Sequence, residues 1–302
     1  MKKHGGGAYA GLALAAVLVL AAGSVAPAAV IPGTILTPGL WFEADVGVTV
    51  DGSNKVSTWA DQSGGGWNAT QTTAANRPAY VTNVINGKPV VRGFSSTAFL
   101  NLTYGNSTTH SPLNGLSGVT VFMVTSCSSA TPNSGWQWMA DGLDWDALGF
   151  TESAEWGCFG VIPAQSRIGW RFGSGGSAGN HTWTRPTNIG TAFSLTTVEH
   201  NVTTDTVYVG GTLGTTVTGA GDPLARISEV GYIGRGHYAT YFPGDIAEII
   251  VLTSAASNAD RQAVESYLGG KYNIAPEPAT MALLALGGIG LLLGRRRRKS
   301  DR

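Results

Sequence analysis

The chain has 302 residues, with 19 basic and 19 acidic side chains, 43 glycines and a charged fraction of 13%. Eight of the basic residues and two of the acidic residues lie in the terminal segments 1–30 and 276–302, so the body between them carries a net charge of about −6. A mildly acidic body argues against binding to nucleic acid or to an anionic membrane surface, because both require clustered positive charge.

The N-terminus has the order of features of a secretory signal peptide. A basic head occupies residues 2–4, an unbroken run of Leu, Val and Ala follows at 12–22, and small residues stand at 26–28. The run is about half of the ~20 residues that a spanning helix needs. We therefore expect signal peptidase to remove residues 1–28, with an uncleaved membrane anchor as the alternative.

Short runs of β-branched and aromatic residues recur through the body, separated by clusters of Gly, Asn, Ser and Pro. The strand-like runs include residues 56–60, 89–94, 119–125, 193–198, 206–209 and 244–252. This spacing is typical of an antiparallel sandwich or barrel. Because no internal repeat is present, we expect one domain over residues 31–275.

The segment between Gly93 and Ser166 contains no Lys or Arg, and its five acidic residues are interleaved with four tryptophans. Grouped carboxylates repel one another, and calcium relieves that repulsion. The candidate calcium ligands are Asp141, Asp144 and Asp146. Indole rings stack on the apolar faces of sugars, and the candidate sugar-binding residues are Trp136, Trp138 and Trp145. The alternative is that the tryptophans are core residues and the acids are solvated.

The only two cysteines are predicted to form a disulfide. Cys127 ends a strand-like run and Cys158 lies in another, and both belong to the exported body. An oxidising compartment and an even cysteine count favour a bridge. It would close a loop of about 30 residues and stabilise the fold by about 3 kcal/mol in the chain-entropy model. Two separately buried thiols are the alternative.

One helix is predicted in the body, over Asn258–Leu268. Ser257 with Asp260 three residues later resembles a capping box, and two glycines at 269–270 are expected to end the helix. The preceding residues 246–252 are almost all apolar, which is typical of a central strand covered on both faces. Glu248 interrupts them, and we expect an arginine or a backbone donor to satisfy its carboxylate.

Motifs at both ends of the body resemble LamG-like jelly rolls of the concanavalin A-like class. The opening motifs are LWFEAD at 40–45, VSTWADQSG at 56–64, NRP at 76–78 and NGKPVVR at 86–92. The closing motif is GDIAEIIV at 244–251, followed by the predicted helix. The resemblance implies an all-β, antiparallel two-sheet jelly-roll sandwich with one short C-terminal helix. It also implies binding of glycans, proteins or calcium without naming a ligand.

No enzyme activity is expected. Glycoside hydrolases need two carboxylates facing each other, and those of the resembled class place acids two and four residues apart on one strand. Asp144 and Asp146 share that phase, but Leu148 occupies the third position. The histidines lack zinc-ligand spacing. A non-catalytic carbohydrate-binding or adhesion module is therefore expected, with a structural matrix component or a glycoside hydrolase as the alternatives.

The C-terminus carries a second targeting signal. In order, it contains Pro276, Glu277 and Pro278, then the apolar residues 281–293, then Arg295, Arg296, Arg297, Arg298 and Lys299. This order resembles the PEP-CTERM sorting tail over residues 276–302. The resemblance implies a short transmembrane helix with cytoplasmic arginines, transient anchoring in the membrane, cleavage by an exosortase, and delivery to the cell surface or extracellular matrix. A permanent tail anchor is the alternative.

Overall fold

The structure is a computed structural model. It describes residues 30–95, 97–104, 113, 116–127, 146–151, 156–162, 167–171, 180–184, 192–218, 231–235, 241–242 and 244–274. Only the backbone is described for residues 103–104, for residue 127 and for the strands between residues 146 and 184.

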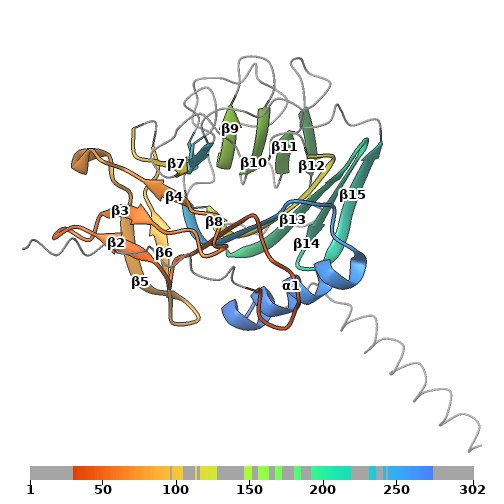
Figure 1. Ribbon diagram of the computed structural model, residues 1–302, viewed down its shortest axis with the longest axis horizontal. Helices are drawn as coiled ribbons and strands as arrows, with labels where there is room; N and C mark the ends of the chain where they lie inside the picture. Colours follow the sequence, from red (N-terminus) through yellow and green to blue (C-terminus); the bar gives the residue numbers. More distant parts are fainter. Residues whose placement is uncertain are drawn as a thin grey trace, which may run out of the picture.

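The described strands form two antiparallel sheets that stack face to face (Figure 1). Sheet A contains, in spatial order, β15 (Thr212–Thr218), β14 (Thr204–Val209), β13 (Ser194–Asn201), β8 (Gly118–Cys127), β17 (Gly244–Leu252), β6 (Lys88–Arg92) and β5 (Ala79–Ile85), with β1 (Leu40–Glu43) paired to β17. Sheet B contains β12 (Asn180–Thr184), β11 (Arg167–Arg171), β10 (Trp156–Ile162), β9 (Asp146–Thr151), β16 (Gly231–Ile233), β7 (Leu100–Tyr104), β4 (Trp67–Thr70), β3 (Val56–Trp59) and β2 (Val48–Val50). The predicted jelly-roll sandwich is confirmed.

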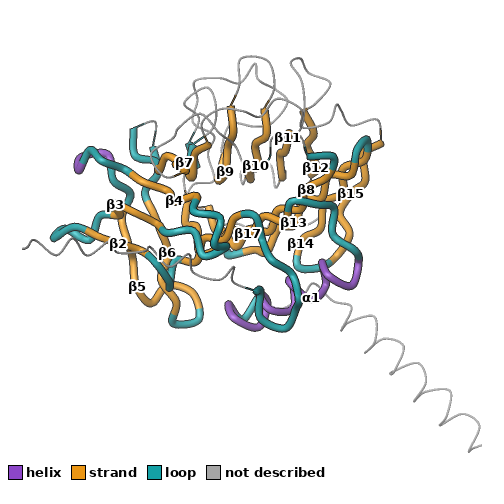
Figure 2. The backbone as a smooth tube through the Cα atoms, in the orientation of Figure 1, coloured by secondary structure: helices purple, strands orange, loops and turns teal. Residues whose placement is uncertain are grey.

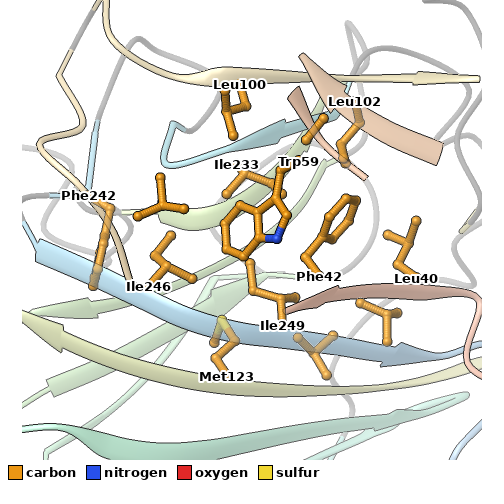
Figure 3. Close-up of a cluster of buried hydrophobic side chains, with 14 of the residues drawn as sticks. Leu40, Phe42, Trp59, Leu100, Leu102, Met123, Ile233, Phe242, Ile246 and Ile249 are labelled. Carbon is orange, nitrogen blue, oxygen red and sulfur yellow. The ribbon is translucent and has the colours of Figure 1, made fainter. Parts of the chain in front are cut away.

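The main core lies between the two sheets. Figure 3 shows Trp59 at its centre, with Phe42 and Ile249 from sheet A and Leu100 and Ile233 from sheet B around it. Trp59 is fully buried, and its ring meets the Phe42 ring edge-on at 5.7 Å between centroids. Alternate residues of each strand supply these side chains, because successive side chains of a strand point to opposite faces.

A second core lies on the other face of sheet A, under helix α1 (Asn258–Tyr272). Figure 2 shows the position of this helix relative to the strands. The second core joins Val264 and Leu268 of the helix to Ile250 and Leu252 of β17. Because β17 is therefore covered on both faces, all nine of its residues are buried, as its apolar sequence predicted.

The helix begins at the predicted residue but ends four residues later than predicted. Ser257 is the N-cap, and its Oγ accepts the Asp260 N–H at 3.1 Å. The two glycines at 269–270 do not end the helix; it continues to Tyr272 and closes at Asn273, which has a φ of 53°. Each glycine costs the helix about 1 kcal/mol. The buried contacts of Lys271 and Tyr272, described below, outweigh that cost.

Candidate functional site

Most of the predicted ligand-binding residues lie outside the described part of the chain. These are Trp136, Trp138, Trp145, Asp141 and Asp144. Asp146 is the first residue of β9, where only its backbone is described. Within the described residues, no group of three or more His, Cys, Asp or Glu side chains is arranged to hold a metal ion. The calcium and tryptophan sites therefore stay predictions.

The two cysteines lie on strands of different sheets. Cys127 ends β8 in sheet A, opposite Gly244. Cys158 lies in β10 of sheet B, opposite Gly149 and Arg171. A disulfide between them would therefore link the two sheets rather than neighbouring strands of one sheet. The bridge itself stays a prediction, because neither side chain is among those described.

Both predicted targeting segments, residues 1–28 and 276–302, lie outside the described residues. In the part of the chain that the structure does describe, no helix combines the length and the apolar character needed to cross a membrane.

An aromatic and cationic group lies on the face of sheet B that points away from sheet A. We call it the outer-face cluster; it consists of Phe99, Tyr232 and Arg235. Its position follows from β16, which lies between β7 and β9 in the upper layer of Figure 1. Ile233 of β16 is fully buried and points into the core (Figure 3), so the adjacent Tyr232 faces outward.

The three side chains of the outer-face cluster are in mutual contact. The rings of Phe99 and Tyr232 meet edge-on, with 5.4 Å between centroids. The guanidinium carbon of Arg235 lies 4.4 Å from the centroid of Phe99 and 5.0 Å from that of Tyr232. This is the geometry of cation–π attraction. All three residues are half-buried, so the cluster is a partly exposed platform.

A glycine turn carries the chain from β16 to Arg235. Gly234 has a φ of 81°, and a Cβ on it would lie 1.9 Å from the Phe94 ring. The Gly234 carbonyl is held in place as well, because it accepts the Phe242 N–H at 3.1 Å. Only glycine fits this turn, so the direction in which Arg235 leaves the sheet is set by the core beneath it.

Polar side chains adjoin the two rings on the same face. Asn101 of β7 lies directly opposite Tyr232 of β16, and Thr70 of β4 lies opposite Asn101. Both are half-buried. Residues directly opposite each other in an antiparallel pair are close neighbours. The face therefore combines aromatic rings with amide and hydroxyl groups, the mixture that small-ligand sites use for contact area and for orientation.

Sequence reasoning missed the outer-face cluster. Phe99 and Tyr232 are far apart in the chain, and Arg235 stands in a glycine-rich segment with no strand-like run around it. The alternation of Tyr232 and Ile233 is compatible with a two-faced strand, but three residues are too few to identify one. The register of β16 with β7 is what brings the cluster together.

A second polar group, buried beneath helix α1, has a structural role. The Lys271 ammonium lies 2.5 Å from Glu43, 2.9 Å from Asp45 and 2.8 Å from Glu248. The carboxylate of Glu248 also accepts the Trp41 indole N–H at 2.8 Å and the Tyr272 hydroxyl at 2.7 Å. The prediction that an arginine or a backbone donor satisfies Glu248 was therefore wrong. A lysine and two aromatic donors do so instead.

The paired carboxylates of this group cannot reach a polymer substrate. Glu43 and Glu248 lie directly opposite each other on β1 and β17, an arrangement that resembles a catalytic pair of carboxylates. Glu248 is nevertheless fully buried and Glu43 is 8% exposed, because helix α1 covers them. Burial raises the pKa of Glu248 despite the opposing attraction of Lys271. The group binds the helix to the sheet.

Tyr272, the half-buried Tyr267 and Lys271 predict a loss of stability in alkali. Burial, followed by the charge of Glu248, raises the pKa of both Tyr267 and Tyr272. Burial alone would lower the pKa of Lys271, but its attraction to Glu248 and Glu43 outweighs that and raises it. The folded state thus retains protons that the unfolded chain releases above about pH 10, so unfolding becomes more favourable as the pH rises.

We expect the urea midpoint of unfolding to fall between pH 8 and pH 11, and to fall less in a Tyr272→Phe variant. That substitution removes one of the retained protons. Equal midpoints at the two pH values in the unsubstituted protein would contradict the assignment.

The last residues of the chain match a known sorting signal. Residues 275–298 match the model of the PEP-CTERM protein-sorting motif, which confirms the resemblance of the tail. The motif indicates an exported protein that is sorted to the cell surface. A comparison with curated proteins found no match.

Solved structures resemble this chain at low sequence identity. An HCR/D mutant aligns with a TM-score of 0.50 and 13% identity, over 78% of this chain and 52% of that one. The binding domain of botulinum neurotoxin serotype D gives 0.46 and 11%, over 76% and 50%. Domain 4 of AbnA, a GH43 extracellular arabinanase from Geobacillus stearothermophilus in complex with arabinotriose, gives 0.49 and 13%, over 76% and 98%. This chain thus spans about half of the neurotoxin binding domain, and the likeness concerns the fold.

Proposed function

We propose that this exported protein is a non-catalytic carbohydrate-binding module of the cell surface or extracellular matrix. The observation that supports the proposal is the outer-face cluster, a pair of contacting aromatic rings on a partly exposed sheet face beside amide and hydroxyl groups. Sugars present apolar C–H faces and polar edges, so they complement a surface of this composition.

Each part of the cluster has a defined role in this proposal. The rings of Phe99 and Tyr232 contact the apolar face of a sugar through the ring surface that the Arg235 guanidinium leaves uncovered. Asn101 and Thr70 lie on the neighbouring strands β7 and β4 of sheet B. Their amide and hydroxyl groups hydrogen-bond the hydroxyl groups of the sugar. Because Tyr232, Asn101 and Thr70 lie on strands and Phe99 directly precedes β7, the sheet register positions the site before a ligand arrives.

The proposal is tested by measuring how the exported protein binds a panel of soluble polysaccharides, with and without calcium. We expect Phe99→Ala and Tyr232→Ala each to weaken binding by about tenfold or more, equivalent to about 1.4 kcal/mol. Tyr80→Ala serves as the control, since Tyr80 is a half-buried tyrosine of sheet A. Failure of the protein to bind any polysaccharide would leave the structural matrix role. Release of sugar from the polymers would instead favour the glycoside hydrolase.

We further propose that the tail follows the exosortase route. The protein would then be anchored transiently through residues 276–302 and released on cleavage near the Pro276–Pro278 motif, after signal peptidase has removed residues 1–28. The intact mass of the surface form tests this, and we expect it to lack both segments. A surface form that retains Arg295–Arg298 would show a permanent anchor instead.

A further inference from the structure

Among the residues that the structure describes, the arginine of the outer-face cluster has no acidic partner. The structure describes the side chains of four arginines, and three of them, Arg77, Arg92 and Arg261, form ion pairs with carboxylates. Among the described residues, Arg235 contacts aromatic rings but no carboxylate. Its Nε atom is buried and has no hydrogen-bond partner there.

The Arg235 guanidinium lies beside both rings of the cluster. Its carbon is 4.4 Å from the Phe99 centroid and 5.0 Å from the Tyr232 centroid, and the two ring planes stand at 85° to each other. A guanidinium carries five N–H donors in its plane, and those of Arg235 have no carboxylate partner among the described residues. A planar fork of donors matches the two oxygens of a carboxylate, and such a pair is stronger than a neutral hydrogen bond.

We propose that the outer-face cluster binds a sugar that carries a carboxylate, such as a uronic acid unit of an acidic polysaccharide. Arg235 receives the carboxylate, while Phe99 and Tyr232 receive the ring to which it is attached. This inference rests on the proposed glycan-binding function and adds the chemical class of the ligand.

The charge of the body makes Arg235 decisive for such a ligand. The body carries about −6, so an acidic polymer gains no attraction from the overall field of the protein. Binding must then come from a local cation with good geometry rather than from diffuse charge. Removing this one cation is therefore expected to have a large effect, whereas removing a cation elsewhere is not.

The test compares two ligands that differ only in the carboxylate, namely oligogalacturonate and its methyl ester, on the exported protein. We expect the acid to bind at least tenfold more tightly than the ester. Arg235→Gln should abolish this preference, weakening binding of the acid at least tenfold more than binding of the ester. Lys55→Gln removes the same charge from a half-buried lysine before β3, and should retain the preference. Arg235→Lys keeps the charge without the planar fork and should be intermediate.

The outcomes separate this inference from the proposed function. If the ester binds as tightly as the acid, or if Arg235→Gln retains the preference, the carboxylate site is wrong and glycan binding stands. If neither ligand nor any other polysaccharide binds, both proposals fail. A sulfated glycan that binds through Arg235 more tightly than the acid would overturn the assignment to carboxylates. Melting temperatures of all variants, measured in parallel, show that they are folded.

Discussion

Replacing Lys271 with methionine is expected to destabilise the protein by about 3–5 kcal/mol, the cost of leaving buried charges without their partner. The ammonium of Lys271 lies within 3 Å of the carboxylates of Glu43, Asp45 and Glu248. Methionine has a similar length but no charge, so these carboxylates would remain beneath helix α1 with one cation fewer. Urea unfolding at neutral pH measures the effect.

Lys88→Met is the matched control for this prediction. Lys88 also pairs with Asp45, at 2.8 Å, but its side chain is 39% exposed and it contacts no other carboxylate among the described residues. Exposed ion pairs contribute at most about 1 kcal/mol. In addition, Glu248→Gln in the Lys271→Met background should recover part of the loss, because it removes a buried charge. Equal costs for the two lysine substitutions would contradict the role assigned to Lys271.

The motifs that revealed the fold are the residues that hold its strands together. In the opening motifs, Asp61 accepts the backbone N–H of Trp41 and that of Ser63, both at 2.9 Å, and the Ser63 hydroxyl at 2.6 Å. This carboxylate thus ties β1 to the turn after β3. These hydrogen bonds need the side chains of Asp61 and Ser63, so the motif can be recognised in the sequence. The closing strand was readable for a different reason, since burial on both faces demands an apolar run.

The helix boundary shows where local patterns are insufficient. Two glycines at 269–270 weaken a helix in isolation, and the prediction accordingly ended it at Leu268. Lys271 and Tyr272 extend it because their partners, Glu248 among them, lie on strands of sheet A. The same limitation explains the wrong partner for Glu248. Its partners are far away in the sequence and are brought to it only by the packing of the helix.

The outer-face cluster could not be predicted from the sequence, because only the tertiary structure brings its three residues together. Its aromatic residues have the same sequence signature as core aromatics, such as Phe42 and Trp59, and only the face of the strand distinguishes them. Tyr232 is on the outer face because its neighbour Ile233 is in the core. Arg235 carries no pattern at all, and its significance comes from the lack of a carboxylate among the described residues around it.

Replacing Trp59 with alanine is expected to cost about 3–5 kcal/mol of unfolding free energy, the range measured for large aromatic residues in cores. Trp59 is fully buried between the sheets and meets Phe42 at 5.7 Å (Figure 3). Its indole N–H also donates to the Glu43 carbonyl at 2.8 Å. Alanine would remove the contacts with both sheets and one of the two hydrogen bonds to that carbonyl, which also accepts the Val46 N–H at 3.1 Å.

Two further variants divide this cost between packing and hydrogen bonding. Trp59→Phe retains a ring in the core but removes the N–H, and should cost about 0.5–1.5 kcal/mol for the lost hydrogen bond, since the Glu43 carbonyl still accepts the Val46 N–H. Trp67→Ala, at a half-buried tryptophan on neighbouring β4, should cost less than Trp59→Ala because less apolar surface is lost from the core. Denaturant unfolding of the three variants gives the order. A cost for Trp67→Ala that equals or exceeds that of Trp59→Ala would place the centre of the core nearer to β4, and Trp59 at its margin.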